Sequence, residues 1–300
     1  MSISVANAPC SWGVLEFEEQ APTYGYSEVL DQIAASGYAG TELGDWGFMP
    51  TEPALLHDQL HRRSLALVGA FVPVALSDPN DHLRGLETAI RTAALMRDAG
   101  FPDACIVLAD RTEGNTARIS RAGRVTAADG LSPGLWDVFA RGCNNIARTV
   151  RESTGLRTVF HPHCASFVET AAEIDALMTH TDPALLGLCL DTGHITYAGD
   201  DPIAVYERHR ERVWHVHLKD CEHRIAVLAR QEQLDYFAVV RRGVFCELGH
   251  GAVDFPHLME RLKRDRYEGW AVVEQDVLPA LGTPLASATR NRACLRGFGL

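Results

Sequence analysis

The stretch LCLDTGH, residues 188–194, decides the fold of this chain. Its apolar residues are typical of a buried strand, and the run ends in a carboxylate, a glycine that permits a turn and an imidazole. Two later stretches have the same build, a short hydrophobic segment followed by oxygen or nitrogen donors: VWHVHLKD at residues 213–220 and GWAVVEQD at residues 269–276. In a barrel of parallel strands the C-terminal strand ends face one mouth, where active sites lie. The three stretches therefore predict one shared site.

Strand-like and helix-like patterns alternate along the rest of the chain. Besides the three stretches above, the predicted strands are residues 3–8, 40–44, 65–76, 104–109 and 157–160. The predicted helices are residues 26–36, 53–62, 82–99, 135–154, 169–180, 202–212, 254–265 and 287–298. These repeats follow one another without a linker, and no GxGxxG phosphate loop follows a strand. We therefore predict an α/β fold, a single (β/α)8 TIM barrel that forms one domain over residues 1–300.

Two segments depart from the regular repeat. Residues 110–130 are polar and poor in large apolar side chains, which predicts a long βα loop, either mobile or acting as a lid. Residues 221–242 have a helical pattern and lie between the last two predicted strands. We therefore expect a helical insertion there, in addition to the regular helix at residues 254–265.

Charge and hydropathy argue against several kinds of partner. The formal net charge is −11 at pH 7 and no lysine or arginine cluster stands out, unlike in a nucleic-acid-binding protein. No run reaches the roughly 18 apolar residues of a membrane span, and the first residues lack the pattern of a signal peptide. The cysteines are scattered without a CxxC pair, as expected for reduced core thiols. We predict a cytoplasmic protein without nucleic-acid or membrane partners, and the oligomeric state stays open, a homo-oligomer included.

Asp191, His217 and Glu274 are the residues expected to hold one divalent metal. Each lies at the end of a hydrophobic strand, and a buried carboxylate such as Glu274 needs a partner to offset the cost of burial. Asp191 has a structural alternative, because Asp-Thr-Gly turns also cap helices. Of His215 and His217 we expect one, taken to be His217, to face the barrel interior and the other to face the helices. The set suits Mn²⁺, Co²⁺, Mg²⁺, Fe²⁺ or Zn²⁺.

A fourth ligand is expected where the predicted strand at residues 157–160 ends. The sequence HPH follows at residues 161–163, and its two histidines share a face because they are two residues apart. We take His161 as the metal ligand. The candidates for proton transfer are His161, His163, Lys219 and Glu274. Lys219 has an alternative as a solvated charge at a strand end.

Four further residues are candidates for substrate binding: Trp12, Glu42, His194 and His250. Trp12 follows the first strand and is either a platform on which a sugar ring stacks or a packing residue. Glu42 lies at the end of the second strand and can accept hydrogen bonds from polyol hydroxyls. His250 lies between two glycines, which allow a tight turn with exposed backbone.

At these residues the chain resembles the xylose-isomerase-like barrel superfamily of sugar isomerases, epimerases and endonuclease IV. The shared marks are LDTGH at residues 190–194, HVHLKD at residues 215–220 and VVE at residues 272–274. Within the superfamily the chain is most similar to the inosose dehydratase branch. The marks of that branch are APCSWG at residues 8–13, GTELG at 40–44, HPH at 161–163, TDPAL at 181–185, GHGAVDF at 249–255 and GW at 269–270. The resemblance spans nearly the whole chain.

The resemblance implies a metal-dependent dehydratase that removes water from a keto-cyclitol such as 2-keto-myo-inositol through a metal-stabilised enediolate, with Mn²⁺ or Co²⁺ as the metal. His161 stands where most of the superfamily has a glutamate, which favours loss of water over the proton exchange between two glutamates in an epimerase. His250 stands where the dehydratases tend to have an acidic residue. The alternatives are a metal-dependent ketose 3-epimerase or sugar (phosphate) isomerase on another keto-sugar, and a non-catalytic sugar-binding barrel.

Overall fold

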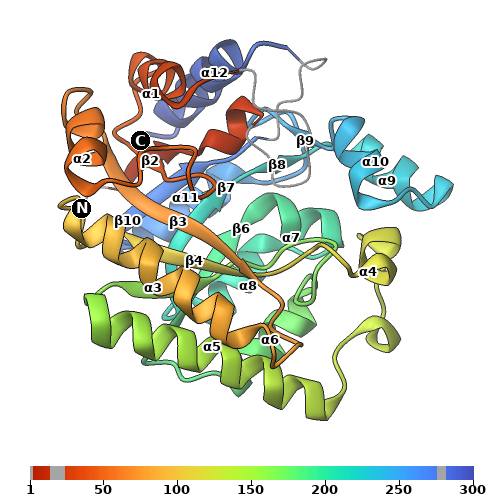
Figure 1. The fold of residues 1–300 in the computed structure, drawn as a ribbon. Helices are drawn as coiled ribbons and strands as arrows, with labels where there is room; N and C mark the ends of the chain where they lie inside the picture. Colours follow the sequence, from red (N-terminus) through yellow and green to blue (C-terminus); the bar gives the residue numbers. More distant parts are fainter. Residues whose placement is uncertain (1–2, 14–23, 276–281) are drawn as a thin grey trace.

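Parallel strands form a closed barrel in the computed structural model of the protein, which describes residues 3–13, 24–275 and 282–300 (Figure 1). The strands are β1 (Ile3–Asn7), β2 (Gly40–Glu42), β3 (Ala66–Val74), β4 (Cys105–Asp110), β5 (Arg157–Phe160), β6 (Leu186–Asp191), β7 (Val213–Leu218) and β10 (Gly269–Val273). They pair in the order β1-β10-β7-β6-β5-β4-β3-β2, and β2 pairs with β1 to close the ring. The predicted (β/α)8 TIM barrel is confirmed.

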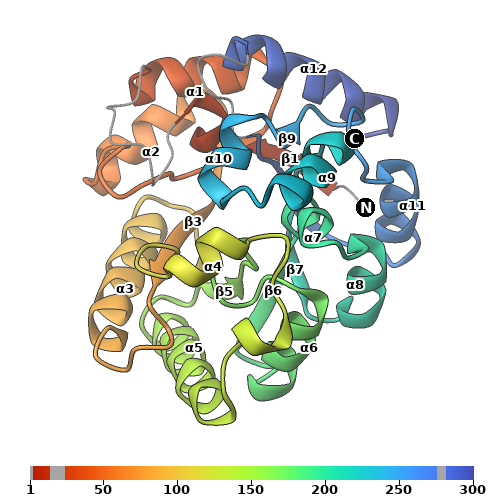
Figure 2. The same cartoon turned by 90° about the vertical axis from the view of Figure 1, so that its right-hand side faces the viewer.

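A ring of helices surrounds the barrel (Figure 2). These helices are α1 (Tyr26–Ala35), α2 (Pro53–His61), α3 (His82–Asp98), α5 (Pro133–Thr154), α6 (Ala171–His180), α8 (Pro202–His209), α11 (Phe255–Arg264) and α12 (Pro284–Gly297). Several begin at side-chain caps, which accept backbone N–H groups that lack a partner within the helix. Asp201 caps α8, and Thr170 with Glu173 forms a capping box at α6.

Alternate strand residues divide between the helix-facing core and the barrel interior. On β6, Leu188 and Leu190 belong to the large core shared by strands and helices. Cys189 instead packs with Val107 and Val159 on the inner side. The next residue with the same orientation as Cys189 is Asp191, so the alternation carries this carboxylate to the mouth of the barrel.

Residues 110–130 contain two short helices where the sequence predicts a long loop. They are α4 (Thr116–Arg121) and the 3-10 helix η2 (Ala127–Asp129). A buried arginine holds the segment in place: Arg118 is 1% exposed, and its guanidinium donates to both carboxylate oxygens of Glu173, at 2.8 and 2.9 Å. Its Nε also donates to the carbonyl of Ser166. Because the segment is fixed by an ion pair, its lack of large apolar residues does not keep it from being ordered.

Residues 221–242 form two helices, α9 (His223–Glu232) and α10 (Tyr236–Arg241), that follow the short strand β8 (Asp220–Cys221). This strand pairs antiparallel with β9 (Phe245–Cys246). Together with α4, the two helices lie beyond one end of the barrel (Figure 1), where they stand in front of its mouth and within the outline of the helix ring (Figure 2). Val239 and Val240 are buried in a cluster that also contains Tyr197 of α7 (Thr192–Ala198).

The eight cysteines are all free thiols, five of them buried and three partly buried. No helix in the described ranges has both the length and the apolar character needed to cross a bilayer.

Candidate active site

Four side chains converge at the C-terminal mouth of the barrel. They are His161, Asp191, His217 and Glu274, and one potential ligand atom of each lies within 4.8 Å of the others. Asp191 ends β6 and His217 lies in β7, while His161 and Glu274 directly follow β5 and β10. These strands are consecutive in the barrel. The structure therefore brings together the residues that the sequence singles out as metal ligands.

The distances within this cluster describe a compact set of donor atoms. Nε2 of His161 lies 3.2 Å from Oδ2 of Asp191. Nδ1 of His217 lies 3.3 Å from Oε2 of Glu274 and 3.8 Å from Oδ2 of Asp191, and although it is buried it forms no hydrogen bond. A buried polar atom without a hydrogen bond is costly. A cluster of two carboxylates and two imidazoles, one of which carries this nitrogen, fits a divalent cation.

Asp191 also caps a helix, so the structural alternative and the ligand hypothesis are compatible. Its Oδ1 accepts the backbone N–H of His194 at 2.8 Å, at the start of α7. Its Oδ2 is the oxygen that faces His161 and His217. The two oxygens of one carboxylate therefore serve two different partners.

His215 and His217 both face the barrel interior, so the expectation that they lie on opposite faces is wrong. Residues two apart on a strand share a face. The Nε2 atoms of both rings lie within hydrogen-bond distance of Oε1 of Glu42, at 2.8 Å for His215 and 3.0 Å for His217. Val216, between them, packs in the core on the helix side.

Glu42, expected to bind substrate hydroxyls, is engaged by these two histidines. It lines the cavity at the mouth but is only 3% exposed. Burial opposes ionisation of the carboxyl, but the neighbouring imidazoles of His217 and His215 outweigh it and lower the pKa of Glu42 to about 2. Glu42 is therefore an ionised hydrogen-bond acceptor for two imidazoles, one of which belongs to the candidate metal cluster.

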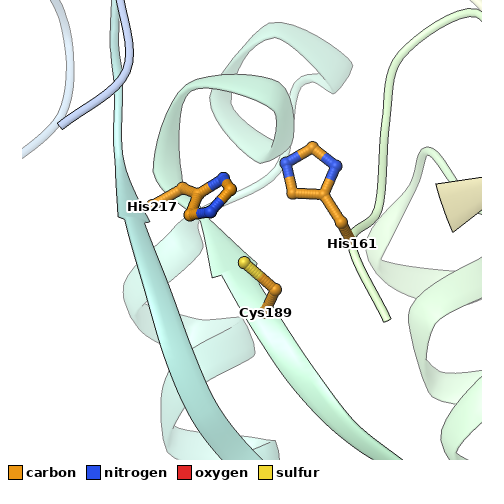
Figure 3. A group of neighbouring side chains, drawn as sticks. All are labelled: His161, Cys189 and His217. Carbon is orange, nitrogen blue, oxygen red and sulfur yellow. The ribbon is translucent and has the colours of Figure 1, made fainter. Parts of the chain in front are cut away.

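A thiol lies beneath the cluster. Figure 3 shows the rings of His161 and His217 next to each other and tilted, with the sulfur of Cys189 below both. One ligand atom of each of these three residues lies within 4.8 Å of the others. Burial raises the pKa of Cys189 to about 12, so the residue is a neutral thiol in the absence of a metal.

Lys219 extends over the neighbouring strand end. Its Nζ lies 3.3 Å from Oε2 of Glu274 and 3.4 Å from Nε2 of His194. Gly193 makes room for the lysine, since a Cβ added there would meet Cγ of Lys219 at 2.4 Å. Lys219 is 3% exposed, which does not fit the alternative of a solvated surface charge.

Tyr236 and Phe237 line the cavity, although no sequence pattern singles them out. They begin α10, and Oη of Tyr236 lies 3.3 Å from Nε2 of His163. Burial, together with the nearby His161 and Lys219, lowers the pKa of His163 to about 3, so this imidazole is neutral at pH 7. In the sequence, the one feature that could have pointed to Tyr236 and Phe237 as cavity residues is that the helical insertion directly follows a strand end.

Acidic side chains predominate among the charged groups that line the cavity. Glu42, Asp45, Glu113 and Glu274 line it, and Lys219 is the one lysine or arginine among the lining residues in the described part of the chain. Lys219 is itself paired with Glu274. This lining suits a neutral substrate better than a phosphorylated one, because a phosphate group needs several cationic donors.

Trp12 does not lie in the cavity. It is 2% exposed and packs in the main core, and its Nε1 donates to Oε1 of Gln32 on α1 at 2.7 Å. Trp12 ends the 3-10 helix η1 (Pro9–Trp12), which turns the side chain towards the helix ring. The packing alternative therefore describes this residue, and the sugar-stacking expectation is corrected.

His250 does not reach the cavity either. It is exposed and is absent from the described lining residues. The turn around it has a structural cause: the carboxylate of Asp220 accepts the backbone N–H groups of Gly249, Gly251 and Val253, at 2.8, 2.8 and 3.1 Å. A Cβ on Gly251 would meet this carboxylate at 2.3 Å. The two glycines thus allow the backbone to wrap around Asp220, and the side chain between them points elsewhere.

Curated relatives match the chain along nearly its whole length. An inosose dehydratase of Geobacillus kaustophilus (strain HTA426) is 33% identical over 281 residues, covering 94% of this chain and 90% of the relative. The rhizopine catabolism protein MocC of Rhizobium meliloti is 32% identical, covering 96% of this chain and 86% of the relative.

The fold is shared with solved structures. The probable 3-DHS dehydratase AsbF of Bacillus anthracis superposes with a TM-score of 0.73 at 16% sequence identity, covering 98% of this chain and 99% of that one. A family model described as a xylose isomerase-like TIM barrel matches residues 30–296. The resemblance read from the sequence motifs is therefore confirmed, and the chain belongs to the xylose isomerase-like TIM barrel family.

Proposed function

We propose that this protein is a metal-dependent dehydratase that removes water from a keto-cyclitol such as 2-keto-myo-inositol. The observation that carries the proposal is the cluster of His161, Asp191, His217 and Glu274, whose ligand atoms lie within 4.8 Å of one another. The reaction is suggested by relatives named inosose dehydratases, the first of which is 33% identical. A mixed oxygen and nitrogen donor set suits Mn²⁺ or Co²⁺, and also Mg²⁺, Fe²⁺ or Zn²⁺.

A divalent ion held by these residues supplies Lewis-acid polarisation of the substrate ketone, which makes the adjacent C–H group more acidic. Because His161 and Glu274 are assigned to the metal, the proton transfers fall to other groups. His163 lines the cavity, and burial lowers its pKa to about 3, so its imidazole is neutral at pH 7. We assign it as the base that removes the proton next to the ketone.

Lys219 is the proposed acid. Its Nζ lies 3.3 Å from Oε2 of Glu274, a carboxylate that favours the ammonium form. The ammonium donates a proton to the departing β-hydroxyl, and the C–O bond breaks as the C=C bond of the enol forms. The substrate loses one proton to His163 and one hydroxide with the proton of Lys219, which together amount to one water.

The residue after β5 favours dehydration over epimerisation. An epimerase that works with two carboxylates needs one on each face of the substrate. In this chain His161 and His163 follow β5, and Glu274 is in the metal cluster. His163 as proton acceptor and Lys219 as proton donor then take the place of the two carboxylates, and both lie next to His194.

The test is an assay on 2-keto-myo-inositol with chelated enzyme, then with Mn²⁺ or Co²⁺ restored. The absorbance of the enolised diketone product is followed, and mass spectrometry checks for loss of one water. Metal-dependent water loss is the expected result. Exchange of substrate hydrogen with D₂O without loss of water identifies an epimerase or isomerase instead, and equal activity with and without chelator overturns the metal assignment.

A further inference from the structure

One oxygen of a buried glutamate receives two imidazoles across the interior of the barrel. Oε1 of Glu42 lies 2.8 Å from Nε2 of His215 and 3.0 Å from Nε2 of His217. Glu42 ends β2 and both histidines lie in β7, two strands that are not neighbours in the barrel. All three residues are at most 3% exposed. A hydrogen bond in such an environment strongly restricts the rotation of the ring.

The two ring nitrogens of His217 face different partners. Nε2 faces Glu42, and Nδ1, on the opposite edge of the ring, lies 3.3 Å from Oε2 of Glu274. An acceptor-only carboxylate at Nε2 requires the proton to stay on that nitrogen. When the ring carries only this one proton, Nδ1 is the nitrogen with the lone pair, and it faces Asp191 and Glu274.

From this we infer that Glu42 is a positioning residue for the metal centre: it fixes the orientation and tautomer of His217, so that His217 binds the metal through Nδ1. His215 holds the same carboxylate oxygen from a second side and keeps Glu42 in place. The inference rests on the proposed metal site. Partners of this kind orient ligating histidines in many metalloproteins.

Glu42, His215 and His217 also bring ligand atoms within 4.8 Å of one another, but we do not assign Glu42 as a ligand. Its Oε1 is shared by the two Nε2 atoms. It also lies at the edge of the His217 ring opposite to the Asp191 and Glu274 carboxylates. Gly69 on β3 shows how closely the carboxylate is enclosed, because a Cβ there would lie 3.0 Å from Oε1 of Glu42. The glycine leaves the space that the Glu42 carboxylate occupies.

The first test compares metal affinities by isothermal titration calorimetry with Mn²⁺, using the full-length chain after chelation. Glu42→Gln is expected to weaken Mn²⁺ binding by about tenfold to a hundredfold, because a neutral amide oxygen is a weaker acceptor for the two imidazoles than the carboxylate. Glu169→Gln is the matched control. Glu169 is also buried, at 1% exposed, but accepts the backbone N–H groups of Gly123 and Ala165 away from the cluster. The Mn²⁺ affinity of the Glu169→Gln variant is expected to equal that of the wild type.

A second variant leaves the charge intact. Gly69→Ala pushes a methyl group against the Glu42 carboxylate, and is expected to weaken Mn²⁺ binding while preserving the fold as followed by circular dichroism. This variant keeps the inference testable if Glu42→Gln fails to fold.

The tautomer of His217 is read directly from ¹⁵N shifts of the histidines in Zn²⁺-loaded protein, with His217→Gln used for assignment. A protonated Nε2 and a metal-bound Nδ1 are expected. Binding through Nε2, or Mn²⁺ affinities of Glu42→Gln and Gly69→Ala equal to that of the wild type, overturns the role of Glu42. If the wild type itself binds no metal, the proposed function fails instead, so the two failures are distinct.

Discussion

Asp191 accepts the backbone N–H of His194 at 2.8 Å through Oδ1, and this bond ties the candidate metal centre to the start of α7. The other oxygen of the same carboxylate faces the imidazoles of His161 and His217. The helix cap therefore fixes the rotation of the carboxylate, and the orientation of Oδ2 does not depend on a bound ion. A ligand held in this way loses little conformational freedom when it binds a metal.

Asp191→Asn separates the two tasks of this residue. Asparagine caps helices about as well as aspartate, so α7 and the thermal stability of the metal-free protein are expected to persist. Metal affinity is expected to fall by more than about a hundredfold, beyond the loss from an outer partner, as measured by calorimetry with Mn²⁺. Asp201→Asn, at the cap of α8, is the control and should leave affinity unchanged. Retained Mn²⁺ binding in Asp191→Asn contradicts the ligand assignment.

Lys219→Met tests the proposed acid. The variant removes the ammonium next to Glu274 but none of the candidate ligands. We expect kcat for water loss to fall by about 10²–10⁴-fold, the usual contribution of a general acid, while the content of bound metal stays at the wild-type level. Turnover is measured in the diketone assay and metal content by elemental analysis. Unchanged turnover assigns the proton donor elsewhere.

Arg118→Met tests whether the buried arginine fixes the segment at residues 110–130. Removing it leaves the carboxylates of Glu169 and Glu173 without their cation, at 3.9 and 2.8 Å. The expected loss is about 3–5 kcal/mol in the free energy of unfolding, as for other broken buried ion pairs, measured in urea. Arg121→Met, on the same helix but half-exposed, should cost about 1 kcal/mol or less. Similar losses for both variants argue against a special role for Arg118.

Glu169 predicts a pH-dependent stability. Burial raises its pKa from an ordinary 4.5 to about 7, although Arg118 and backbone N–H groups oppose the shift. The folded state therefore holds a proton that the unfolded state has lost, and this contribution to stability, complete below pH 4.5, is lost as pH rises to 7. Between about pH 5.5 and 8, wild type should lose roughly 2 kcal/mol more unfolding free energy than Glu169→Gln, at 1.36 kcal/mol per pKa unit. Parallel curves in urea titrations at the two pH values contradict this.

The site residues at the strand ends were predictable because charged side chains follow directly on buried apolar runs there. Asp191 and Glu274 each follow an apolar run, where an unpartnered carboxylate would be unfavourable, so a shared partner is the economical explanation. The period of two along a strand predicts which residues share a face, and correct use of that period places His215 beside His217. The alternation along β7 does not predict that Glu42, across the barrel, contacts both histidines. The bond to Glu42 depends on the closure of the sheet, which brings β2 and β7 within reach.

Side chains that leave the strands were less predictable. Trp12 and His250 both lie in turns near the mouth, and their direction is decided by the local backbone: a 3-10 helix for Trp12 and the wrapping of amides around Asp220 for His250. Tyr236 reaches the cavity because α10 packs over the mouth, a tertiary arrangement that helical periodicity does not encode. The burial of Arg118 was not predictable either, because nothing in the polar segment at residues 110–130 distinguishes this arginine from the other arginines there.

The candidate ligands all come from one contiguous half of the barrel, β10-β7-β6-β5. A bound ion therefore acts as a cross-link within that half and leaves β1 to β4 without one. Amide hydrogen exchange should show this asymmetry: removing the metal should speed exchange along β5, β6, β7 and β10 far more than along the opposite strands. With the proposed ion bound, the rigidity of the barrel would thus be unevenly distributed about its axis.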